Sequence, residues 1–131
     1  MTNEASRLIE KGERALRAAE TLLQSGDAES AIGRAYYAMF HAAQALLRAR
    51  DLRYRKHSGV HAAFAEHFIK PGVLPPQYHR WLIDAFDERL SADYDADFDT
   101  DALRARTLID RAGEFLAEAK NHLKDQAGEQ P

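Results

Sequence analysis

Cysteine is absent from this chain of 131 residues. Its absence excludes a disulfide framework, a thiolate zinc site and a cysteine nucleophile, and it suits a reducing compartment, so we expect a cytoplasmic protein. No apolar run approaches the roughly 20 residues that span a bilayer. The first residues also lack the basic segment and apolar core of a secretory signal. The sequence therefore predicts neither membrane insertion nor secretion.

Several motifs with known chemistry are missing as well. There is no glycine-rich phosphate-binding loop and no GxSxG motif, which excludes P-loop, dinucleotide-binding and serine-hydrolase functions. Five aspartates alternate with other residues between positions 93 and 101, but no register among the first three supplies both the glycine and the glutamate of an EF-hand loop. We interpret this acidic loop as a solvated surface or a docking patch for a basic partner.

Charge is distributed unevenly along the chain. The net charge is 18 − 21 = −3, which argues against indiscriminate binding of nucleic acid. Yet residues 48–56 hold five cations and one anion, whereas residues 84–101 hold eight acids and one arginine. The sequence therefore predicts one local basic site and one acidic surface.

Helical periodicity runs through nearly the whole sequence. Small and apolar residues recur at three- and four-residue steps over 5–23 and again over 28–49. Gly26 and Asp27, which lie between these segments, favour a helix end followed by the cap of the next helix. The apolar arc of the second segment exceeds half the circumference, as expected of a central helix with several neighbours.

The second half of the chain continues in the same way. A short helix is expected after position 58, ended by Pro71, and another begins at Pro75 and Pro76. Thr100 is the expected cap of a last helix. We therefore predict an all-α domain over residues 1–125, with a disordered tail over 126–131.

A narrow polar stripe remains on the second predicted helix. Arg34 and His41 are seven residues apart, about two helical turns, so both side chains leave the same face, with Tyr37 between them. A cation beside a titratable imidazole can hold a phosphodiester and move a proton along it. The alternative is that these residues only solvate the exposed face that any helix must have.

Histidines also occur at the start of the short helix. His57 and His61 are four residues apart, but no third ligand accompanies them at a recognisable spacing and Gly59 lies between them. We therefore predict no metal site and no cofactor. In this interpretation His57 belongs to the basic turn that precedes the short helix.

Four ordered segments point to a family. They are the run Gly33-Arg34-Ala35-Tyr36-Tyr37-Ala38-Met39-Phe40-His41-Ala42-Ala43, the turn Lys56-His57-Ser58-Gly59-Val60, the linker Lys70-Pro71-Gly72-Val73-Leu74-Pro75, and Arg89-Leu90-Ser91-Ala92-Asp93-Tyr94. Together they resemble the HEPN domain (higher eukaryotes and prokaryotes nucleotide-binding), in its small stand-alone prokaryotic branch. The resemblance covers nearly the whole chain.

The resemblance implies an up-and-down bundle of four main helices with a short extra helix, usually dimeric and often encoded beside a small nucleotidyltransferase. Many members of the family are metal-independent ribonucleases, including toxins of toxin–antitoxin pairs. Their active motif is an Arg, four to six residues, and then a His. Arg34 and His41 satisfy that spacing.

The sequence departs from the family pattern in two respects, and these leave a second site open. The resemblance places the ribonuclease motif on a late helix, with a polar residue after the Arg, whereas here it lies on the second helix and Ala35 follows Arg34. The late helix offers Arg89, Asp93 and Tyr94 but no His at the required spacing. If that helix carries the site, the protein binds nucleotide or RNA without cleaving it.

Two functional hypotheses follow. In the first, a homodimer cleaves RNA: His41 is general base and acid, Arg34 stabilises the phosphorane and Tyr37 hydrogen-bonds the phosphate. In the second, the same groups hold a nucleotide, RNA or a nucleotidyltransferase partner, and no bond is broken. In both, a basic group at the end of the second helix and in the following turn contacts the ligand. Its members are Arg48, Arg53, Arg55, Lys56 and His57.

Overall fold

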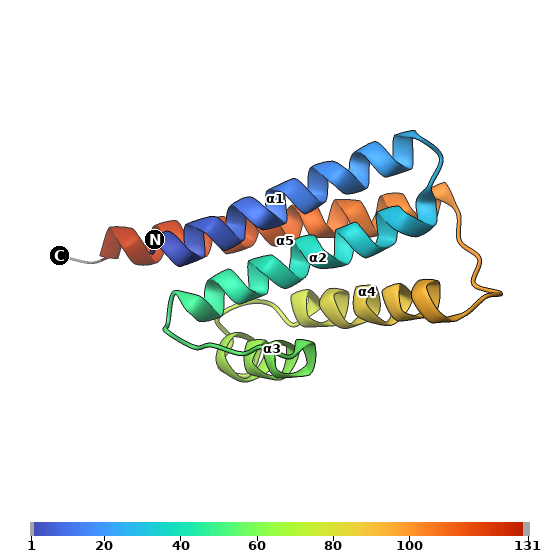
Figure 1. Cartoon of the computed structure of the whole chain (residues 1–131). Helices are drawn as coiled ribbons and strands as arrows, with labels where there is room; N and C mark the ends of the chain where they lie inside the picture. Colours follow the sequence, from blue (N-terminus) through green and yellow to red (C-terminus); the bar gives the residue numbers. More distant parts are fainter. Residues whose placement is uncertain (1, 130–131) are drawn as a thin grey trace.

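The computed structural model describes residues 2–129, and within that range the chain is helical with connecting turns and loops (Figure 1). In chain order the elements are α1 (Asn3–Gln24), α2 (Ala28–Arg48), α3 (His57–Phe64), the π-helical segment η1 (Ala65–Ile69), α4 (Gln77–Tyr94) and α5 (Ala102–Glu129). The helices α1, α2, α4 and α5 run up and down, and the short α3 lies beside α2 and α4 (Figure 1). The expected all-α bundle is confirmed.

The boundary between α1 and α2 follows the predicted signals. Gly26 has φ +89°, a left-handed conformation that glycine adopts readily at a helix end. The Asp27 carboxylate then accepts a hydrogen bond from the Ser30 amide at 3.0 Å. This cap begins α2 at the position that the sequence indicated.

The start of α5 corrects one prediction. The Arg104 amide donates to the Asp101 carboxylate at 2.8 Å, so Asp101 is the cap rather than Thr100. Asp101 caps the helix because its carboxylate reaches the Arg104 amide, three residues ahead, which has no acceptor within the helix. At its other end α5 continues to Glu129, beyond the start of the predicted tail, and residues 130–131 lie outside the described part of the chain.

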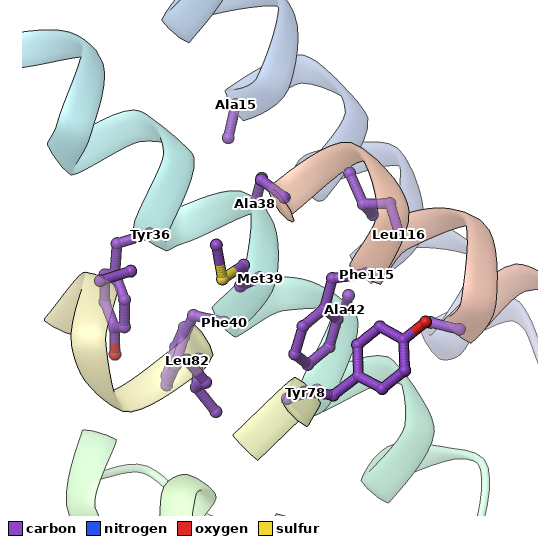
Figure 2. Close-up of a cluster of buried hydrophobic side chains, with 14 of the residues drawn as sticks. Ala15, Tyr36, Ala38, Met39, Phe40, Ala42, Tyr78, Leu82, Phe115 and Leu116 are labelled. Atoms are coloured by element: carbon purple, nitrogen blue, oxygen red, sulfur yellow. The ribbon is translucent and has the colours of Figure 1, made fainter. Parts of the chain in front are cut away.

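The central element is α2, which packs against α1, α3, α4 and α5. Figure 2 shows part of this core, where Met39 and Phe40 of α2 lie near Leu82 of α4 and Phe115 of α5. Twelve residues of α2 are buried: Ala31, Ile32, Ala35, Tyr36, Ala38, Met39, Phe40, Ala42, Ala43, Ala45, Leu46 and Leu47. One copy of the chain therefore covers the wide apolar arc of α2. No helix within residues 2–129 is long and apolar enough to cross a membrane.

A close helix crossing holds α1 against α2. Gly12 of α1 is buried there, and a Cβ at this position would lie 3.1 Å from the backbone oxygen of Ala38 and 2.8 Å from Cδ2 of Leu116. The first distance is tight, and the second requires the Leu116 side chain to move. Glycine therefore sets the separation of the two helices whose facing surfaces form the site described below.

A buried polar bridge ties α3 to α2. The Tyr36 hydroxyl lies 2.7 Å from Nδ1 of His57 and 2.8 Å from Nε2 of His61, and the Tyr36 side chain is inaccessible to solvent. A phenol has one proton, so it donates to one ring nitrogen and accepts from the N–H of the other. The His57 ring also stacks on Phe40, with the centroids 4.4 Å apart.

Burial governs the protonation of this bridge. Burial, together with smaller contributions from the neighbouring His57 and His79, lowers the pKa of His61 to about 4. Burial also lowers the pKa of His57, with a smaller contribution from Arg89, and raises the pKa of Tyr36. The bridge is therefore a neutral one at neutral pH.

The Gly12 crossing can be tested by adding one methyl group. We expect Gly12→Ala to be less stable than the matched variant Gly113→Ala by about 1–3 kcal/mol, because overpacking opposes the gain in helix propensity only at Gly12. At Gly113 a Cβ would lie 3.8 Å from the Leu16 side chain, an ordinary contact. Urea denaturation followed by circular dichroism measures the difference. Equal stabilities would show that Gly12 does not limit the helix separation.

The bridge predicts a loss of stability in mild acid. An unfolded histidine titrates near 6.5, above the lowered folded pKa of His61, so the unfolded chain binds more protons below that pH. The free energy of unfolding should therefore fall as the pH drops from 6.5 to 5, with His61 accounting for about 2 kcal/mol of the loss. Urea denaturation across this range measures the slope. His61→Asn should reduce the slope, and a slope unchanged in that variant would contradict the assignment.

Candidate active site

The polar stripe of α2 faces α1 across a hollow of about 490 Å³. Arg34 is exposed, whereas Tyr37 and His41 are half-buried. The hollow is lined by Lys11, Arg14, Ala15, Ala18, Arg34, Tyr37 and His41. The structure thus brings the predicted arginine, tyrosine and histidine together, and adds two cations from α1.

His41 is held in one orientation. Its Nδ1 lies 3.1 Å from Oε1 of Gln44, and its ring stacks on Tyr37 at a centroid distance of 5.9 Å. Because Oε1 can only accept a hydrogen bond, Nδ1 carries the proton, and Nε2 of the neutral ring keeps its lone pair. With the Gln44 amide in this orientation, the neutral ring can act as a base through Nε2.

The protonation of His41 follows from its surroundings. Burial is the main cause that lowers its pKa, and the positive charges of Lys11 and Arg14 and the nearby His57 lower it further. The hydrogen bond to Gln44 acts in the opposite direction, but it is outweighed. At neutral pH His41 is therefore an uncharged imidazole among cations, as a general base requires.

A second hollow, of about 400 Å³, lies between α2 and α4. Arg34 and Tyr37 line this hollow as well as the first one, together with Arg89 and Asp93 of α4. The Arg89 guanidinium lies over the Tyr37 ring, 4.9 Å from its centroid, and Nε of Arg89 is 3.5 Å from the Asp93 carboxylate. Tyr94 is 82% exposed and does not line the hollow.

The two sites that the sequence offered as alternatives are therefore neighbours. Tyr37 lies between them, with His41 stacked on its ring and the Arg89 guanidinium over it. The first hollow holds a base and cations, whereas the second holds two arginines, one partly neutralised by Asp93, and no histidine. Chemistry on a phosphodiester is accordingly suited to the first hollow, and ligand binding alone to the second.

The predicted basic group divides into residues with different environments. Glu4 of α1 pairs with Arg48 at 3.5 Å and with Arg53 at 2.9 Å, so part of their charge is compensated. Arg55 and Lys56 are exposed in the turn. These two remain the cations of the turn that are most open to a ligand.

His57 is placed differently from the sequence interpretation. Its ring points into the bundle, on Tyr36 and Phe40, rather than into the basic turn. Together with His61 it meets the tyrosine hydroxyl, and within residues 2–129 no group of three metal-ligating side chains is found. The histidine pair is thus a structural link between α3 and α2.

Three residues of the site were not singled out from the sequence for a role. Lys11 and Arg14 belong to the polar face of α1, and Gln44 lies on the polar stripe of α2, one turn after His41. The available signal was the match between two polar stripes, one on each of two antiparallel neighbours. Only the packing of α1 on α2 shows that these stripes face each other.

Known proteins are similar in sequence to this chain over most of its length. The HEPN domain model matches residues 5–123. A protein of Methanocaldococcus jannaschii named as a putative toxin is 37% identical over 120 residues, which is 92% of this chain and 82% of that protein. A second such protein of the same organism, also named as a putative toxin, is 36% identical over 93% of this chain and 90% of its own length.

A relative with a less specific name extends the comparison. A UPF0332 protein of Thermotoga maritima is 32% identical over 127 residues, which is 94% of this chain and 96% of that protein. The family match includes residues of all four main helices, among them the three that line the hollows. The chain belongs to the HEPN domain family.

Proposed function

We propose that this protein is a toxin-like HEPN endoribonuclease that cleaves RNA without a metal ion or other cofactor. The observation that carries the proposal is His41, a neutral imidazole with Nδ1 committed to Gln44 and Nε2 available in a hollow lined by Lys11, Arg14 and Arg34. The names of the two archaeal relatives, which describe them as putative toxins, support the biological role.

The groups of the hollow suit each step of the reaction. His41 Nε2 takes the proton of a ribose 2′-hydroxyl, and the resulting oxygen attacks the adjacent phosphorus. Arg34 stabilises the charge that develops on the phosphorane, and the Tyr37 hydroxyl donates to a phosphate oxygen. A 2′,3′-cyclic phosphate forms as the bond to the 5′-oxygen breaks, and that oxygen takes up a proton.

The proton that the leaving 5′-oxygen takes up is the reason to propose a homodimer. One chain places one histidine in the hollow, and a ring that takes the proton of the 2′-hydroxyl cannot at the same time protonate the leaving 5′-oxygen. A second copy of His41 would supply the acid if two hollows face each other. The apolar arc of α2 gives no independent support, because one chain buries it.

A partner is part of the proposal. We infer a nucleotidyltransferase with an antitoxin-like role, which rests on the family resemblance and on the names of the relatives. The acidic segment 84–101 offers a surface for basic groups of such a partner.

A non-catalytic role is the second candidate. The hollow between α2 and α4 presents Arg34 and Arg89 beside Tyr37, a set that can hold a phosphate, and its lining includes two carboxylates but no histidine. In that case the protein binds nucleotide or RNA and serves as partner or adaptor of the nucleotidyltransferase. Cleavage assays separate the two candidates.

Loss of the base or the arginine should remove cleavage while the fold persists. His41→Ala should abolish metal-independent cleavage, and Arg34→Ala should slow it a hundredfold or more, on the order of 2.7 kcal/mol of transition-state stabilisation. EDTA should have no effect on the wild-type rate. Gel assays on labelled RNA measure the rates, and circular dichroism checks the helix content.

Two further variants sharpen this test. His67→Ala, which changes a histidine outside both hollows, should cleave like the wild type. Gln44→Leu should slow cleavage and shift the acid limb of the pH–rate profile, which in the wild type should lie below pH 6.5 because the pKa of His41 is lowered. Activity that survives His41→Ala, or a wild type inactive on every RNA with and without its partner, would favour the binding role.

The dimer predicts a definite mass. Light scattering at micromolar concentration should give about twice the 14.8 kDa of one chain, because a base and an acid from two copies are needed. Mixing His41→Ala with the wild type should then lower activity below the sum of the separate proteins. A clean monomer with full activity would exclude the two-copy site.

A further inference from the structure

We propose that a single RNA strand lies along the groove between α1 and α2, with its phosphates held by Arg7, Lys11 and Arg14 of α1. This inference names the substrate path of the proposed nuclease and so rests on that proposed function. None of these three residues belongs to the basic group predicted from the sequence at the end of α2 and in the turn that follows it. The groove adds α1 to the binding surface.

Two adjoining hollows form the groove. Beside the hollow that contains His41 lies another of about 420 Å³, and the two share Lys11 and Arg14. This adjoining hollow is lined by Glu4, Arg7, Leu8, Glu10, Lys11, Arg14 and Arg48. The groove therefore continues from Arg34 past His41 to Arg48 at the other end of α2.

Helix geometry explains why the cations line up. Arg7, Lys11 and Arg14 follow steps of four and three residues, so they share one face of α1. Arg34, His41 and Arg48 follow steps of seven on the antiparallel α2. The two rows face each other over about 10 Å of helix between Arg7 and Arg14, which is longer than one phosphate group requires.

The groove is positive although the chain is not. Five cations line the two hollows, against two acids, Glu4 and Glu10, in a chain of net charge −3. Glu4 is already engaged by Arg48 and Arg53, which leaves the α1 cations free of that carboxylate. A local concentration of positive charge in an acidic protein attracts a polyanion to that place.

Continuity favours RNA over an acidic peptide as the occupant. The row of cations leads at one end to His41, whose Nε2 suits the proton of a ribose hydroxyl. At the other end, Glu4 joins Arg48 of the groove to Arg53 of the turn, next to the exposed Arg55 and Lys56. Because Arg34 lies beyond His41 in the other direction, an extended strand meets cations on both sides of the bond to be cut.

The test measures RNA binding in the absence of cleavage. In a His41→Ala background, the affinity for a short labelled oligouridylate is followed by fluorescence anisotropy at several salt concentrations. Adding Arg7→Gln and Lys11→Gln should lower the salt slope by about 1.4, at about 0.7 per lost contact, and weaken binding on the order of tenfold at about 0.1 M salt.

The matched control removes the same charges elsewhere. Arg80 and Lys70 are exposed and line neither hollow, and α2 separates α4 from α1 (Figure 1). Arg80→Gln with Lys70→Gln should leave the slope unchanged. Equal effects of the two pairs, no effect of the groove pair, or absence of RNA binding would each overturn the path. The path would also be overturned if Arg7→Gln with Lys11→Gln weakened the binding of an acidic peptide but not that of RNA.

The proposed function fails by a different result. If the wild type does not cleave but its RNA binding depends on Arg7 and Lys11, the groove stands and the nuclease does not. If cleavage depends on His41 but the protein with Arg7→Gln and Lys11→Gln binds RNA like the protein without them, the proposed nuclease is supported and the path along α1 is excluded.

Discussion

The contact between α1 and α2 at Gly12 is the constraint on which the site depends. A Cβ there would meet the backbone of Ala38 and the side chain of Leu116, so the two helices approach as closely as they do because that atom is missing. The close approach brings Lys11 and Arg14 beside His41, which lies on the exposed side of the same crossing. Stability and the candidate chemistry thus share one packing contact.

Burial favours neutral histidine rings at two places in the bundle, but the ring nitrogens meet different partners there. At His41 it lowers the pKa and leaves a neutral ring with an open Nε2 in a hollow. At His57 and His61 it also favours the neutral rings, but both nitrogens nearest Tyr36 meet its hydroxyl. A lowered pKa therefore does not distinguish a catalytic histidine from a structural one. The partner of each ring nitrogen does.

The positions of the charged residues, rather than the net charge, determine where this protein can attract an anion. The net charge is negative, yet two rows of cations converge in the groove between α1 and α2. On the other side of the stripe, Arg89 is held over Tyr37 and paired with Asp93. An arginine restrained in this way is suited to position a ligand, whereas Arg34 is exposed and belongs to both hollows.

The sequence by itself determined the helical class, the central place of α2 and the face that carries Arg34, Tyr37 and His41, because periodicity and caps are local properties of the chain. It also showed the family through ordered motifs. Only the tertiary structure decided which second helix faces that stripe, and hence the roles of Lys11 and Arg14. It also turned His57 inward, since a ring nitrogen finds its partner on another helix, at a sequence separation that no local pattern encodes.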